Sequence, residues 1–126
     1  NTQLTGTGMI CGTPAYMAPE QAQNETLDPR TDLYALGVIL YEMITARQPF
    51  RGHYEQAMLY SILNEQPAPL ATMSSDIPLD LEWIIAKALA KNPDDRYPSM
   101  EDFHANLAAH LERIWPGRNV ATDGWP

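Results

Sequence analysis

The sequence predicts an all-α fold, and three observations support that prediction. Apolar residues recur at helical spacing in four segments, at about 32–45, 54–65, 79–89 and 99–114. Proline, glycine or a capping hydroxyl stands near the ends of these segments, where helices begin and stop. The 126 residues are 44% hydrophobic and 19% charged, which is typical of a globular domain large enough to bury a core.

Composition narrows the function classes. The net charge of −8 and the scattering of the eight basic residues argue against a nucleic-acid partner, because phosphate backbones are bound by clustered Lys and Arg. The single cysteine, Cys11, cannot form an internal disulfide and suits a reducing compartment, so we expect a cytoplasmic chain. Cys11 itself is expected to be a small buried hydrophobe rather than a reactive thiol.

The ends of the sequence carry no targeting signal. The longest apolar run, from Ala35 to Tyr41, is far too short to span a bilayer. The first residues have neither a basic nor an apolar region of the kind found in signal peptides. Because the chain also begins without Met, we expect it to be an excerpt of a longer protein, and the cytosolic part of a membrane-anchored kinase is one alternative for that protein.

The first third of the chain predicts a loop followed by a buried helix. Residues 1–14 are rich in Thr and Gly and lack an apolar period, so they are expected to be a loop, with a one-turn helix at 19–22 that starts on proline. The segment from Asp32 to Thr45, capped by Thr31 or Asp32, is apolar on nearly every face and is expected in a core. Gly37 in its middle indicates close packing, since glycine there costs about 1 kcal/mol relative to alanine.

The remaining elements are amphipathic helices. Segment 54–65 is one, a Pro- and Ser-containing loop covers 66–78, and 79–89 is the next helix, stopped by Asn92-Pro93. Ser99 is expected to cap the last helix, whose apolar stripe is Phe103, Leu107, Leu111 and Ile114. His104 and His110 lie on that helix without a metal-ligand partner at useful spacing and are expected on the surface.

Three motifs in order carry a resemblance to a known family. They are Gly12-Thr13-Pro14-Ala15-Tyr16-Met17-Ala18-Pro19-Glu20, Asp32-Leu33-Tyr34-Ala35-Leu36-Gly37, and Asn92-Pro93-Asp94-Asp95-Arg96. Together they resemble the activation-segment end, the central helix and a later arginine of eukaryote-like protein serine/threonine kinases of the bacterial type. The resemblance implies that 1–114 is part of a kinase domain, its helical C-terminal lobe without the N-lobe or catalytic loop, and that 115–126 is a linker or tail.

The resemblance assigns regulatory and substrate-binding roles to the first motif. Thr5 and Thr7 have the spacing of activation-loop phosphothreonines, whose phosphates order such loops by pairing with arginine. Thr13 resembles the residue that supports the catalytic aspartate, and its context implies Ser or Thr as the phosphorylated residue. The apolar wall for the residue after the target hydroxyl would be Ile10, Pro14 and Met17.

The resemblance also implies a structural set. Glu20 is expected to pair with Arg96, as the glutamate of Ala-Pro-Glu does in the family. Asp32 is expected to accept hydrogen bonds from the backbone of the catalytic loop, with a simple helix cap as the alternative. Ile39 and Met43 match positions that support the adenine-side hydrophobic spine indirectly, with plain core packing as the alternative.

The sequence lacks the motifs of catalysis itself. It contains no Gly-rich phosphate loop, no strand lysine with its helix glutamate, no His-Arg-Asp and no Asp-Phe-Gly. A complete kinase would use ATP and Mg²⁺ on protein substrates, but most binding residues for them are absent here, so the chain alone is expected to be inactive without the missing N-terminal part. A pseudokinase-type protein-binding scaffold and an unrelated helical interaction domain remain as alternatives.

Overall fold

The computed structural model describes residues 14–73, 76–114 and 116, and throughout these residues the regular structure is helical. This confirms the predicted fold class. The α-helices are α1 (Pro19–Ala22), α2 (Pro29–Thr45), α3 (Glu55–Asn64), α4 (Leu79–Ala88) and α5 (Met100–Ile114). Short 3-10 turns are η1 (Pro14–Tyr16), η2 (Leu70–Thr72), within the predicted loop, and η3 (Pro93–Asp95).

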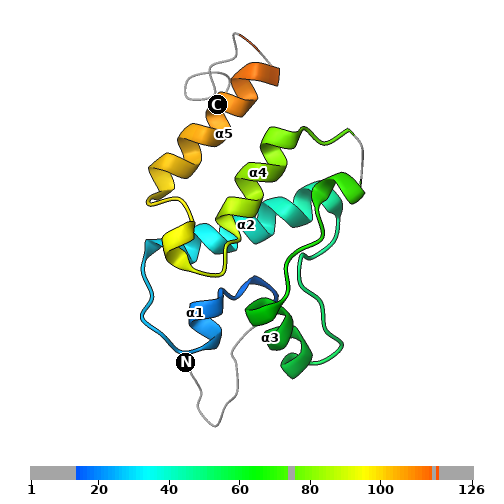
Figure 1. The fold of residues 1–126 in the computed structure, drawn as a ribbon, viewed down its shortest axis with the longest axis vertical. Helices are drawn as coiled ribbons and strands as arrows, with labels where there is room; N and C mark the ends of the chain where they lie inside the picture. Colours follow the sequence, from blue (N-terminus) through cyan, green and yellow to red (C-terminus); the bar gives the residue numbers. More distant parts are fainter. Residues whose placement is uncertain (1–13, 74–75, 115, 117–126) are drawn as a thin grey trace, which may run out of the picture.

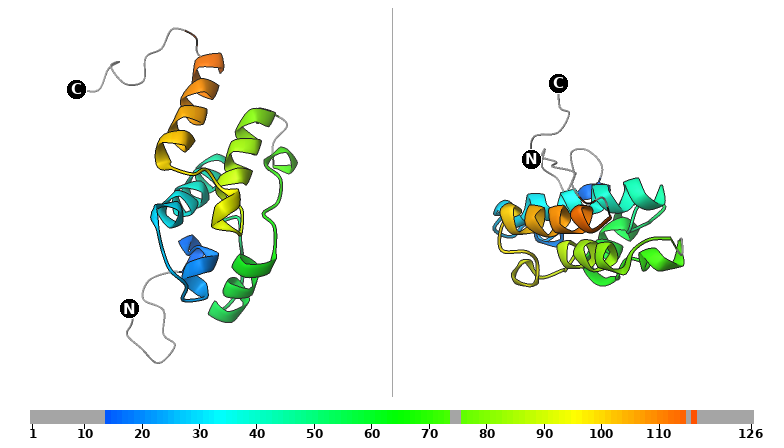
Figure 2. Two further views of the ribbon diagram at one scale, coloured as in Figure 1. Left: turned by 60° about the vertical axis from the view of Figure 1, so that its left-hand side comes forward. Right: turned by 90° about the horizontal axis from the view of Figure 1, so that it is seen from above.

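Helix α2 is the element around which the others are placed. In Figure 1 it crosses the middle of the molecule, with α4 and α5 on one side and α1 and α3 on the other, and the left view in Figure 2 keeps this arrangement. It packs against α4, α5 and η1, while α1 lies against α3. Among the described residues no helix is long and apolar enough to cross a membrane.

The start of α2 differs from the prediction. The helix begins at Pro29 rather than near Asp32, and its cap is Asp28, whose carboxylate accepts a hydrogen bond of 2.7 Å from the backbone N–H of Arg30. Proline suits the first helical position because its ring fixes a helical φ and the missing N–H has no partner there in any case. Thr31 is not the cap residue but its partner in a capping box, because its hydroxyl accepts a hydrogen bond of 3.4 Å from the backbone N–H of Asp28. The same hydroxyl donates a hydrogen bond to the carboxylate of Glu20.

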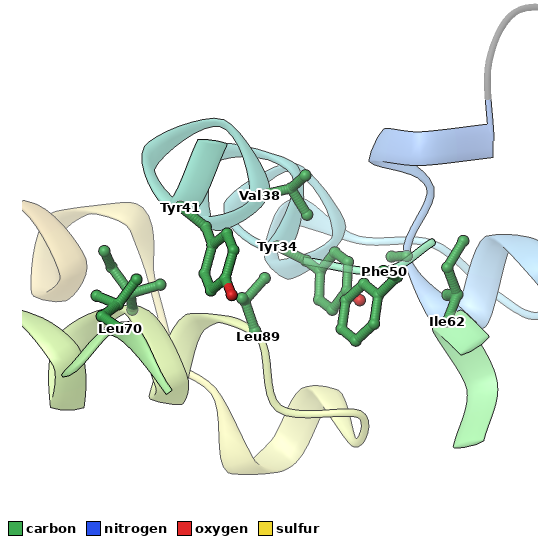
Figure 3. Close-up of a cluster of buried hydrophobic side chains, with 9 residues drawn as sticks. Tyr34, Val38, Tyr41, Phe50, Ile62, Leu70 and Leu89 are labelled. Atoms are coloured by element: carbon green, nitrogen blue, oxygen red, sulfur yellow. The ribbon is translucent and has the colours of Figure 1, made fainter. Parts of the chain in front are cut away.

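Two clusters of buried side chains hold the helices together. The larger one, shown in Figure 3, joins α2 to α3, α4 and the intervening loops, and Tyr34 stacks on Phe50 within it with ring centroids 6.5 Å apart. The second joins the other side of α2 to α4 and α5. Within it, the ring centroids of Tyr97 and Phe103 lie 5.3 Å apart. Burial of this kind stabilises the folded chain by about 25 cal/mol for each Å² of apolar surface removed from water.

Gly37 lies where α2 and α4 approach most closely. A Cβ at this position would be 3.0 Å from the Cβ of Ala88 and 3.2 Å from Cδ2 of Leu89. These distances are shorter than ordinary van der Waals contact, so a larger residue would push the helices apart. The close packing that the sequence predicts is therefore confirmed.

One face of α2 is not buried, which corrects the expectation of a helix covered nearly all round. Ile39 is 41% exposed and Met43 is 74% exposed. The composition of the helix indicated burial, but within the described residues no element lies over these two side chains. The cluster-forming residues of α2 occupy its other faces.

Helix α5 places one of its histidines differently from the prediction. Ser99 accepts a hydrogen bond of 3.1 Å from the backbone N–H of Asp102, as expected for the cap, and His104 is exposed. His110, expected on the surface, is only 6% exposed, and neither ring nitrogen has a hydrogen-bond partner in the described structure. The reason is its spacing. His110 lies three residues after Leu107 and seven after Phe103, and residues at these spacings share one face of a helix.

Candidate functional site

A buried ion pair joins the start of the described chain to the segment that follows α4. Nη1 of Arg96 lies 2.7 Å from Oε2 of Glu20, and Nη2 lies 2.8 Å from Oε1, so the pair is bidentate. Their side chains are 0% and 4% exposed. The structure thus brings together two residues that are 76 positions apart, as the motif implied. We call this pair the latch.

Every N–H of the Arg96 guanidinium has an acceptor. Besides Glu20, it donates to the backbone carbonyls of Arg30 at 3.0 Å, Ala90 at 2.8 Å and Lys91 at 3.2 Å. Its plane also lies over the ring of Tyr34, with the guanidinium carbon 4.8 Å from the centroid. Since the fork donates in fixed directions, these bonds fix α1, the first turn of α2 and the segment after α4 relative to one another.

The latch holds Glu20 in its ionised form. Burial alone would raise the pKa of Glu20, but the hydrogen bonds from Arg96 and from the hydroxyl of Thr31, 2.8 Å away, together with the charge of Arg96, hold that pKa below its ordinary value. A carboxylate kept charged and fully bonded is suited to structure and not to proton transfer.

The turn η1 and the residue after it connect to the end of α2. The hydroxyl of Tyr16 donates a hydrogen bond of 2.5 Å to Oε1 of Glu42, and this bond is the main cause of the raised pKa of Tyr16. The backbone N–H of Met17 bonds to the carbonyl of Pro14 at 3.0 Å. Pro14 and Met17 are half-buried, and Met17 packs on the larger core cluster, so this part of the predicted substrate-binding segment rests on the helical scaffold.

The other predicted site residues of the first motif, Thr5, Thr7, Ile10 and Thr13, lie outside the described residues, as does Cys11. Asp32 is described and exposed, and its side chain forms no hydrogen bond or ion pair with any other residue that the structure describes. The spacing of Asp32, Ile39 and Met43 places them on one face of α2, which is the exposed face.

Sequence reasoning missed a pocket between the end of α2 and the start of α3. Its volume is about 610 Å³, and its lining includes Glu42, Arg47, Arg51, Gly52, His53 and Met58. No binding role is predicted from the sequence of segment 47–52. Two arginines and a histidine within seven residues were the signal for a charged site, but their convergence depends on how the chain folds back onto α3.

The described residues do not fit the cofactors of phosphoryl transfer. They contain no group of three or more His, Cys, Asp or Glu side chains that could hold a metal ion. A nucleotide with its Mg²⁺ needs carboxylate ligands and phosphate-binding backbone together.

Comparison with known proteins agrees with the geometry. The family model described as "Protein kinase domain" matches residues 2–107. Serine/threonine-protein kinase PknB of Mycolicibacterium smegmatis is 41% identical over 104 residues, covering 82% of this chain and 17% of the relative. PknB of Mycobacterium leprae is 38% identical, covering 85% of this chain and 17% of the relative.

A third relative comes from another genus. Serine/threonine-protein kinase pkn3 of Myxococcus xanthus is 44% identical over 108 residues, covering 84% of this chain and 20% of the relative. The chain thus spans about a fifth or less of the length of these relatives. The region that matches the family model contains both residues of the latch, Glu20 and Arg96.

Proposed function

Because this chain belongs to the protein kinase family, we propose that it is the helical-lobe portion of an enzyme that transfers the γ-phosphate of ATP to Ser or Thr residues of proteins. The relatives are named serine/threonine-protein kinases, which favours an enzyme over the alternative of a pseudokinase scaffold. The observation that carries the proposal is the latch, since it ties the motif containing Thr13 and Pro14 to the scaffold at the place where the family motif requires an anchor.

The proposed roles follow the motif residue by residue. Thr5 and Thr7 are the phosphorylation sites that order the activation segment. Thr13 supports the catalytic aspartate of a loop that this sequence lacks. The residue after the target hydroxyl is received by an apolar wall, which consists of Ile10, Pro14 and Met17. The half-buried positions of Pro14 and Met17 support this assignment.

The exposed face of α2 is proposed to bind the part of the kinase domain that is not in this chain. Ile39 and Met43 form an exposed apolar stripe on this face. Packing of another element on the stripe would remove these side chains from water, which is favourable. At one end of the stripe, Asp32 offers a carboxylate to backbone N–H groups. ATP and Mg²⁺ would bind mainly through residues of that other part, so the 126-residue chain alone is inactive.

The test compares two chains in transfer of labelled phosphate from ATP with Mg²⁺ to Ser- and Thr-containing acceptor peptides. The chain extended by its encoded preceding residues, through the catalytic motifs, is expected to transfer phosphate, and the 126-residue chain is not. Ending the extended chain after residue 114 should leave transfer unchanged, because 115–126 is proposed to be a linker or tail. Transfer by the 126-residue chain, or none by the extended chain, contradicts the proposal.

A further inference from the structure

The pocket between α2 and α3 contains positive charge that the described chain does not neutralise. Arg47 and Arg51 line it, and neither guanidinium forms an ion pair or a side-chain hydrogen bond with another described residue. The other described arginines, Arg30, Arg96 and Arg113, are each paired with a carboxylate. The chain has a net charge of −8, so two unpaired arginines that line one cavity give this site a charge opposite to that of the chain as a whole.

Backbone structure fixes the segment that carries these arginines. Ala46, at the end of α2, has a left-handed φ of 60°, which turns the chain back over the helix end. A Cβ on Gly52 would lie 2.4 Å from the backbone nitrogen of Met58, so the chain rests directly on the first turns of α3. Tyr54, the residue before α3, provides no side-chain cap for that helix.

The one carboxylate of the lining is already engaged. Glu42 accepts the hydrogen bond from the hydroxyl of Tyr16, so one of its oxygens points to the turn η1. The two arginines outnumber this single charge, and His53 adds ring N–H donors beside them. The bond between Tyr16 and Glu42 also places the pocket next to the segment that is proposed to bind substrate.

We propose that this pocket binds a carboxylate side chain of an acidic peptide whose neighbouring residues lie along the segment from Pro14 to Met17. The inference rests on the proposed function and adds a substrate class to it, namely protein segments that carry Asp or Glu close to the target hydroxyl. Charge complementarity selects this occupant, because guanidinium groups bind carboxylates through paired N–H donors. The size of the pocket, about 610 Å³, admits an extended side chain with part of its backbone.

Binding is measured on the 126-residue chain by fluorescence anisotropy with two labelled peptides of equal length. One contains Asp and Glu around a central Ser, and the other contains Asn and Gln at the same positions. The double variant Arg47→Gln, Arg51→Gln should bind the acidic peptide about five- to tenfold more weakly than the parent chain, since two exposed ion pairs are lost. The control double variant Lys87→Gln, Arg113→Gln removes the same charge elsewhere and should stay within about twofold.

The outcomes separate this inference from the kinase proposal, because binding requires no phosphate transfer. The inference is supported if the preference for the acidic peptide is lost only in the pocket variant. Amide shifts confined to 14–17 and 46–58, when that peptide is added to the labelled parent chain, support it as well. Equal binding of the two peptides, equal loss in the control variant, or tighter Arg-dependent binding of a single-stranded oligonucleotide overturns it. Far-UV circular dichroism shows that each variant has kept the parent's helix content, as expected for exposed side chains.

Discussion

At the scale of single residues, the charge of Glu20 is the feature that makes the fold sensitive to pH. Burial disfavours this charge. The hydrogen bonds from Arg96 and from the Thr31 hydroxyl, together with the positive charge of Arg96, more than offset the effect of burial. The pKa of Glu20 in the folded chain is therefore below its ordinary value of about 4.5. A group of this kind stabilises the fold at any pH above its unfolded pKa, and the contribution is lost as the pH falls through its folded pKa.

The substitution Glu20→Gln tests this dependence. The amide still offers an acceptor to Arg96 but has no carboxylate to protonate, so the variant should be less stable than the parent at neutral pH. Because the parent loses its advantage on acidification, the difference in melting temperature should shrink as the pH is lowered from about 5 to about 3. Melts followed by circular dichroism across this range give the result, and a constant difference would show that Glu20 is not the titrating group.

Two places in the chain show where sequence reasoning fails. His110 falls on the apolar face of α5, but its polar side chain favoured a surface position over the position implied by its spacing from Phe103. The predicted helix start near Asp32 overlooks Asp28 and Pro29, an acidic cap followed by proline, which is itself a helix start. In both places the sequence contains the local signal for the observed structure.

At the scale of elements, the contact between α2 and α4 depends on one missing side chain. The Cβ of Ala88 and the Leu89 side chain lie against Gly37, so the two helices approach more closely than side chains would otherwise permit. Helix propensity opposes glycine here by about 1 kcal/mol, and the packing compensates for that cost. The apolar pattern predicted which helices exist, but it did not predict the distance between them.

Replacing Gly37 by valine should destabilise the chain by about 1–3 kcal/mol, because the added methyl groups overlap Ala88 and Leu89. Urea denaturation followed by circular dichroism measures the change. The matched control is Ala105→Val on the exposed side of α5, where only the lower helix propensity of valine acts and the loss should be about 0.5 kcal/mol. An equal loss in the two variants would contradict the packing interpretation.

At the scale of the whole molecule, the latch connects segments that the helices alone would leave independent. Arg96 binds α1 through Glu20 and also binds carbonyls at the start of α2 and after α4. Composition and periodicity could not reveal such a contact, because its members are 76 residues apart. It was predictable only from the order of motifs, whereas the pocket beside Arg47 and Arg51 required the path of the chain between α2 and α3.

Removing the guanidinium while keeping a long side chain, as in Arg96→Met, should cost about 3–5 kcal/mol, because the Glu20 charge stays buried without a partner. Arg113→Met breaks the exposed pair with Asp80, whose side chains are 55% and 45% exposed, and should cost at most about 1 kcal/mol. Thermal and urea unfolding of the two variants give the comparison, and loss of any cooperative transition in Arg96→Met counts as the large effect. Equal small losses would contradict a stabilising latch.

The hydrogen bond between Tyr16 and Glu42 ties the lining of the α2–α3 pocket to the turn η1. Loss of this bond would free one acceptor oxygen of Glu42 beside Arg47 and Arg51, although the two guanidinium groups would still outnumber the carboxylate. The segment that is proposed to bind substrate and the charged pocket are therefore mechanically joined through one phenol hydroxyl.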